Sequence, residues 1–194
     1  EIYLEGEAME FKFTDIPDIT TTYIPVKYIN FVSAAESQDD QPATNMIDAS
    51  PFTTWHTKFG KVAKDKAYVT VFDKERVLSQ IAYDPSGGAN GRIKDVEVYV
   101  SLDGKNWTLS GKATNWSNNK ERKILKLSEP KKAKYVKILA TATYSNGMEE
   151  ENKYVSGVRF NYYEDVTKTI KLGNINNDEV IDILDLSILN KYLL

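Results

Sequence analysis

The chain has 194 residues, of which 41% are hydrophobic and 27% charged, and its net charge of −3 comes from well-mixed acids and bases. This composition is typical of a soluble globular protein and argues against nucleic acid or an anionic membrane as a partner. No apolar run approaches the ~20 residues of a membrane-spanning helix. The absence of cysteine excludes disulfides and thiolate chemistry, and a single histidine, His56, excludes a multi-histidine metal site.

Residues 1–27 are mixed in character. The stretch "MEFKF" alternates like a short strand, and two prolines follow within a β-rich composition. We expect an N-terminal extension or the tail of a preceding domain. The chain does not begin with methionine or with a signal-peptide pattern, so we expect it to be a piece of a longer protein.

Residues 28–164 carry a β pattern. "KAYVTVF" reads as a strand, and "RIKDVEVYVS" puts Val96, Val98 and Val100 on one face, as in a half-buried strand. Asp103-Gly104 then predicts a hairpin turn. "ERKILKLS", "KAKYVKILATA" and "SGVRFNYY" predict further strands, separated by long polar loops. Several short strands without a long helical pattern favour a β-sandwich.

The last residues, 173–194, change period and follow a linker at 165–172. Leu186, Leu189 and Leu193 share one face of a predicted helix, which needs a partner to bury it. Before the helix, oxygen-bearing groups occur at the spacing of a calcium-binding loop. These groups are Asn174, Asn176, Asp178, the Val180 carbonyl, Asp182 and Asp185.

This loop departs from the usual calcium pattern at two positions. Glu179 stands where such loops favour glycine, and Asp185 stands where they favour glutamate. An ordinary polar turn with Asp185 as the helix N-cap is the alternative. The stretch 173–194 resembles the first repeat of a dockerin, the module that attaches bacterial polysaccharide-degrading enzymes to a cohesin-bearing scaffold. The resemblance implies a cohesin partner for a complete, two-repeat dockerin, of which this chain has one repeat.

Two segments of the β region, "NMIDASPFTTWHTKF" and "NGRIKDVEVYVSLDGKNW", resemble the discoidin-like (F5/8 type C) family. Within it they are most similar to the family 32 carbohydrate-binding modules. The resemblance spans residues 28–164 and implies an all-β, jelly-roll sandwich followed by the short C-terminal calcium loop and helix.

The resemblance also implies a structural Ca²⁺ ion. The ligands would be carbonyls of Asn45 and Ser50, the Asp48 carboxylate, and Thr53 through its carbonyl and hydroxyl. The acid that usually closes such a site aligns with Gly157, where the side chain is missing, so a carbonyl would have to substitute. A simple turn formed by Asp48 is the alternative.

A sugar site is the second implied feature. The family positions correspond to Asp39 or Asp40, His56, Phe59 and Asn90, with Tyr144 as a possible side wall. Galactose-binding members carry an arginine where this chain has Ser86, which puts the specificity in question. The alternative for a lone histidine beside a tryptophan is a satisfied structural residue.

The two resemblances together imply a non-catalytic carbohydrate-binding module of a secreted, extracellular bacterial glycoside hydrolase. The dockerin-like segment implies that this enzyme could be part of a cellulosome. The expected ligands are galactose side chains or β-mannan ends of plant polysaccharide. Two alternatives stay open. One is a glycosidase using acids in "ESQDD" and "MEEEN", which lack an apolar setting to raise a pKa. The other is a protein- or surface-adhesion module that binds no sugar.

Overall fold

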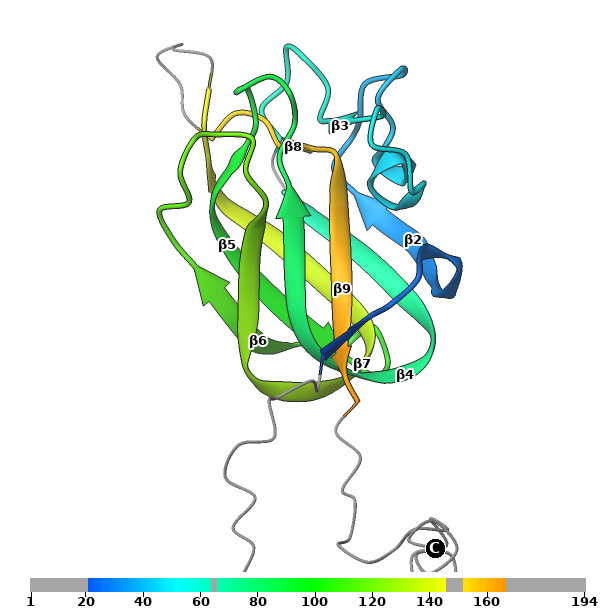
Figure 1. Cartoon of the computed structure of the whole chain (residues 1–194). Coiled ribbons are helices and arrows are strands. Elements are labelled where there is room, and N and C mark those ends of the chain that lie inside the picture. Colours follow the sequence, from blue (N-terminus) through cyan, green and yellow to red (C-terminus); the bar gives the residue numbers. More distant parts are fainter. Residues whose placement is uncertain (1–20, 64–65, 146–151, 167–194) are drawn as a thin grey trace, which may run out of the picture.

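The computed structural model describes residues 21–63, 66–145 and 152–166 (Figure 1). The predicted dockerin-like loop and helix, with all six of its calcium ligands, lie outside the described residues, as do residues 1–20 of the predicted extension and most of "MEEEN". Two short 3₁₀ helices are described, η1 (Val26–Tyr28) and η2 (Ala43–Ile47). Within these ranges no helix has the length and apolar character that crossing a bilayer requires.

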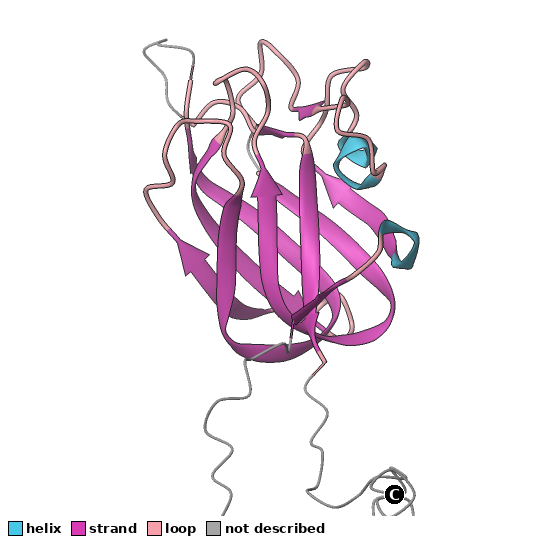
Figure 2. Ribbon diagram, in the orientation of Figure 1, coloured by secondary structure: helices cyan, strands magenta, loops and turns pink. Residues whose placement is uncertain are grey.

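The predicted all-β class is confirmed (Figure 2). The strands are β1 (Thr21–Tyr23), β2 (Ile29–Ala34), β3 (Trp55–His56), β4 (Ala67–Asp84), β5 (Ile93–Ser101), β6 (Thr108–Ala113), β7 (Lys123–Thr143), β8 (Ser156–Gly157) and β9 (Arg159–Asp165). The main sheet follows the order β1-β9-β4-β7-β5-β6, with β2 also paired to β4, and β3 pairs with β8 apart from it.

Two long strands connect both layers of the sandwich. The first part of β4 pairs with β2 and the last part of β7, whereas its second part pairs with β9 and the first part of β7. The register shifts where β7 passes Pro130, between the pairs Leu78↔Lys131 and Gln80↔Lys126. Proline cannot donate to a strand ladder and is tolerated at such irregularities. The two strands predicted at 121–128 and 132–142 are therefore one bent strand.

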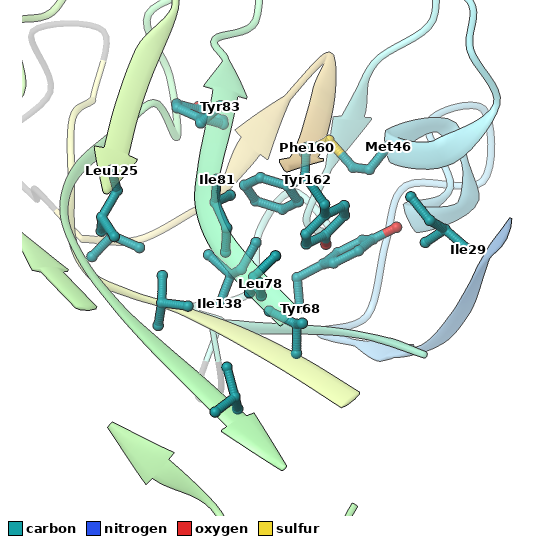
Figure 3. Packing of buried hydrophobic residues seen from close by; sticks show 14 of the residues in the cluster. Ile29, Met46, Tyr68, Leu78, Ile81, Tyr83, Leu125, Ile138, Phe160 and Tyr162 are labelled. Carbon is teal, nitrogen blue, oxygen red and sulfur yellow. The ribbon is translucent and has the colours of Figure 1, made fainter. Parts of the chain in front are cut away.

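The core lies between the layers and is rich in aromatic rings. Val96, Val98 and Val100 are all buried, as their alternation predicted. Tyr68, Phe160 and Tyr162 point into the same interior from β4 and β9 (Figure 3). The fully buried Trp55 packs against Tyr68 with ring centroids 5.3 Å apart, so the core reaches the short strand β3.

Residues 21–27, which the sequence assigned to an extension, are part of this arrangement. β1 pairs with β9 from Thr21↔Asp165 to Tyr23↔Tyr163, and Ile24 is fully buried. The sandwich thus begins before the predicted boundary at residue 28. Figure 1 places β1 and the C-terminal end of β9 at one pole and the loops around β3 and β8 at the other.

Candidate functional site

A pocket of about 350 Å³ opens at the pole that carries β3 and β8. These strands pair Trp55 with Gly157 and His56 with Ser156, which brings the loop after β3 next to the final loop of the sandwich. The loop between β4 and β5 forms the opposite wall. The lining residues are Gln41, Thr54, Trp55, His56, Phe59, Ser86, Gly87, Gly88, Asn90 and Ser156.

His56 lines this pocket with an imidazole ring that is almost fully buried. The side chain is only 7% exposed, and its Nδ1 lies 2.6 Å from the Thr57 carbonyl oxygen. Because a carbonyl only accepts, Nδ1 carries the proton of the neutral ring. Nε2 is buried and has no hydrogen-bond partner of normal geometry among the described residues.

Burial lowers the pKa of His56 below its ordinary 6.5, while the Thr57 and Asn90 carbonyls oppose this shift. The ring is therefore neutral at pH 7, with a lone pair on Nε2. A buried acceptor without a donor is costly unless something else supplies the donor. This favours a ligand-binding role over that of a satisfied structural histidine.

Phe59 supplies an apolar surface beside His56. Its side chain is 55% exposed, and its ring centroid lies 4.4 Å from that of His56. Tyr154 meets the Phe59 ring edge-on at 5.6 Å, and its hydroxyl accepts a hydrogen bond from the Gly60 N–H. Tyr154 thus holds the aromatic wall in position, whereas the residue predicted as a side wall from this loop was Tyr144.

The wall formed by residues 86–90 is built mainly from backbone. Ser86 is buried, and its hydroxyl donates to the Gly88 carbonyl at 2.7 Å and lies 2.8 Å from the Ser156 hydroxyl. The Ser156 hydroxyl in turn donates to the Asn90 carbonyl. The Asn90 side-chain amide forms no hydrogen bond with the other described residues, so it can serve a ligand.

Arg92, which sequence reasoning did not single out, braces this wall from behind. Its Nε and Nη2 donate to the carbonyl oxygens of Ser86 and Gly87 at 3.0 and 2.8 Å, and Nη1 donates to the Asn118 side chain. The guanidinium is buried and does not line the pocket. One side chain thereby fixes two consecutive peptide groups.

The structure brings three of the six predicted sugar-site residues together: His56, Phe59 and Asn90 line the same pocket. Asp39 and Asp40 are exposed in the turn between Gln38 and Gln41 and do not line the pocket, whereas Gln41 does. Tyr144 lies outside the pocket as well. Its hydroxyl donates to the Trp116 carbonyl at 2.7 Å.

The predicted calcium ligands of the sandwich gather only in part. The Asp48 carboxylate accepts hydrogen bonds from the Ser50 N–H at 2.8 Å and from the Thr53 hydroxyl at 2.6 Å. That hydroxyl also lies 3.4 Å from the Ser50 carbonyl oxygen, and Asn45 uses its side-chain amide to bond Thr54. The loop therefore holds one carboxylate whose two oxygens already have protein donors.

Gly157 leaves no room for the acid that would close such a site. A Cβ atom there would lie 2.7 Å from the Tyr83 ring and 3.0 Å from the Met46 methyl. The neighbouring Ser156 carbonyl, which could substitute as a ligand, accepts a hydrogen bond from Tyr83 at 2.5 Å. Across residues 21–63, 66–145 and 152–166, no group of three or more acids, histidines or cysteines gathers that could hold a metal. Asp48 is thus the one carboxylate among the predicted ligands, and backbone carbonyls and the Thr53 hydroxyl would have to complete a site.

We therefore expect this loop to bind calcium only weakly, with a Kd of about 1 mM or above, because affinity rises with the number of charged ligands. Adding EDTA should leave the melting temperature almost unchanged, since a ligand stabilises only in proportion to ln(1 + [L]/Kd). Differential scanning fluorimetry in 1 mM CaCl₂ and in EDTA measures this. A clear loss of melting temperature in EDTA, removed by Asp48→Ala, would contradict it.

No carboxylate lines the pocket, so the paired acids of a glycosidase are not found there. Glu36 of "ESQDD" instead forms salt bridges with Lys58 and Lys61 at 3.1 and 2.9 Å. These lysines hold its pKa below the ordinary value, the opposite of what a general acid requires.

Comparison with known proteins agrees with this fold. Residues 30–155 match the model of the F5/8 type C domain. The family 32 module of NanJ from Clostridium perfringens, solved in complex with galactose, is 27% identical, with a TM-score of 0.63 over 74% of this chain and 99% of that one. CpGH89CBM32-5 from the same organism, solved with GalNAc-β-1,3-galactose, shares the fold at 24% identity and a TM-score of 0.60, covering 73% and 99% of the two chains.

One curated relative is the "A type blood N-acetyl-alpha-D-galactosamine deacetylase" of Flavonifractor plautii, which is 26% identical over 116 residues. The match covers 59% of this chain but only 14% of that protein. The family model, in contrast, spans well over half of the chain. The chain belongs to the F5/8 type C domain family.

Proposed function

We propose that this domain is a non-catalytic module that binds a terminal galactose or N-acetylgalactosamine residue of a glycan. The observation that carries the proposal is the buried Nε2 acceptor of His56 beside the exposed face of Phe59. A sugar ring needs both features, because one face of the ring is made of C–H groups and its edge carries hydroxyl donors. The sugars bound by the NanJ module and by CpGH89CBM32-5 support the choice of ligand.

In this arrangement the ring lies on Phe59, and one hydroxyl donates to Nε2 of His56. The amides of Asn90 and Gln41 bind further hydroxyls. None of these side chains carries a full charge at pH 7, so the pocket lacks charge-assisted hydrogen bonds to the sugar. We expect a Kd on the order of 0.1–1 mM, equivalent to about 4–5.5 kcal/mol.

The wider setting is also proposed. The module belongs to a secreted bacterial glycoside hydrolase and raises the local concentration of its catalytic domain at polysaccharide ends. Residues 173–194 attach the enzyme to a cohesin when the second dockerin repeat is present. The supports are the dockerin-like spacing of that segment and the Clostridium origin of the similar modules.

Binding should depend on pH through His56. Its pKa in the folded protein lies below 6.5, so affinity should stay constant from pH 8 to about 6.5 and fall as the pH drops through the lowered pKa. Protonation there removes the acceptor lone pair. The unfolded chain takes up this proton at higher pH than the folded one, so stability also decreases as the pH falls below about 6.5.

Titration of the ¹⁵N-labelled protein with galactose and N-acetylgalactosamine at several pH values measures both the site and its pH dependence. The amide shifts should cluster at residues 54–59 and 86–90. Tyr144→Phe serves as the control, because it removes a hydrogen bond outside the pocket and should bind with unchanged affinity. Shifts confined to another face, or no response to either sugar, would refute the proposed function.

A further inference from the structure

The glycine wall of the pocket offers two unused backbone donors. The N–H groups of Gly87 and Gly88 donate no hydrogen bond within the described part of the chain. A Cβ atom added at either glycine would meet nothing within 4 Å. Both residues line the pocket, so this side has free donors and free space.

Arg92 polarises the peptide groups to which these donors belong. It donates to the carbonyls of Ser86 and Gly87, and those carbonyls share their peptide units with the N–H groups of Gly87 and Gly88. All described peptide bonds are trans, so each N–H points opposite to its carbonyl, away from the guanidinium. A cation at the carbonyl end strengthens the N–H end as a donor, because hydrogen bonds in a chain polarise one another.

Among the described residues, no acid neutralises the cation behind the wall. Arg92 is buried and forms no ion pair with any carboxylate in residues 21–63, 66–145 and 152–166. Its other partner is the Asn118 side chain, which is neutral. The charge therefore acts through the two peptide groups and makes the glycine wall electropositive.

We propose that the paired N–H groups of Gly87 and Gly88 bind the carbonyl oxygen of an acetamido group, so that the pocket selects an N-acetylated sugar over the plain hexose. The inference rests on the proposed function and names its substrate class. Galactose-binding members of the family carry an arginine at the position of Ser86. In this chain Arg92 supplies positive charge from behind the glycine wall instead. The open space over the glycines receives the acetyl methyl group.

An acetamido oxygen fits this wall better than the two other acceptors a sugar can bring. A carboxylate would have to shed its water for a pocket whose lining carries no formal charge and whose bracing cation, Arg92, lies behind backbone groups. A sugar hydroxyl oxygen is a weaker hydrogen-bond acceptor than an amide carbonyl, and it leaves the open space over Gly87 and Gly88 unfilled. The acetamido group brings a carbonyl and an apolar methyl together.

Calorimetric titration with galactose, N-acetylgalactosamine and galacturonic acid tests the inference. We expect N-acetylgalactosamine to bind about tenfold more tightly than galactose, equivalent to ~1.4 kcal/mol. In ¹⁵N spectra, the Gly87 and Gly88 amide protons should shift downfield with N-acetylgalactosamine and much less with galactose. Arg92→Lys should reduce the preference, because an ammonium cannot bridge two carbonyls as a guanidinium fork does.

Two glycine variants keep the test independent of Arg92, whose replacement can impair folding. Gly88→Val extends a branched side chain into the open space and should abolish the preference while leaving the melting temperature near that of the wild type. Gly88→Ala is the matched control with a smaller effect.

Equal affinities for galactose and N-acetylgalactosamine, without distinct glycine shifts, would overturn this inference and leave the proposed function standing. Tightest binding of galacturonic acid would also overturn it, and binding of none of the sugars would remove the proposed function itself.

Discussion

Replacing Gly157 with glutamate is expected to destabilise the domain by more than about 3 kcal/mol. The new Cβ would lie 2.7 Å from the Tyr83 ring, which is buried and held by hydrogen bonds to the Ser156 carbonyl and the Ile93 N–H. The ring cannot move without breaking both bonds. The carboxylate would then be buried without a cationic partner, which adds a large desolvation cost.

Chemical denaturation of Gly157→Glu with and without 5 mM CaCl₂ measures this effect. Gly157→Ala is the matched control and should lose about 1–3 kcal/mol from overpacking alone. Calcium should not restore the glutamate variant, because the space for its side chain is missing. A stable Gly157→Glu protein whose melting temperature rises with calcium would show that the loop at Asp48 can be completed into a metal site.

Phe59→Ala should strongly weaken sugar binding while changing stability little. The Phe59 ring is 55% exposed, so its removal costs little buried area, yet it is the wall on which the C–H face of the sugar rests. Loss of the stacking contact and of the apolar area buried on it costs ~1–3 kcal/mol, which raises a Kd near 1 mM to between about 5 and 150 mM. Phe59→Tyr should keep most of the affinity.

The chain offers a matched control in Phe52, which is 93% exposed and does not line the pocket. Phe52→Ala makes the same chemical change on a neighbouring loop and should bind sugar like the wild type. Affinity is measured by NMR titration and stability by melting curves. Equal loss in both variants, or wild-type affinity in Phe59→Ala, would show that the ligand rests elsewhere.

Local pattern was enough to predict most of the fold. The alternation of Val96, Val98 and Val100 identified β5 and its buried face, and Asp103-Gly104 identified the hairpin that follows. The bend in β7 at Pro130 was not predictable, because a proline between two strand patterns normally indicates a break. Only the partner strand β4, which continues on both sides, decides that the two patterns form one strand.

The site was predicted less completely for a different reason. Phe59 and Asn90 are side chains that family resemblance locates directly. Tyr154 and Arg92 act through contacts between residues far apart in sequence or through backbone groups, which no local pattern reveals. Tyr144 and Tyr154 both lie in the final loop, and only the path of this loop decides which of them packs beside Phe59. The sequence offered one signal for Tyr154, namely its position just before the last two strands.

The pairing of Thr21 with Asp165 has a practical consequence. Residues opposed across antiparallel strands have Cα atoms about 4.5–5.5 Å apart, so the chain enters and leaves the sandwich at almost the same point. A loop of a host protein could therefore be cut between two adjacent residues and the domain inserted there as a cassette, with little separation of the cut ends. Because that point lies at the pole opposite the loops around β3 and β8, the inserted cassette would hold its pocket outward from the host surface (Figure 1).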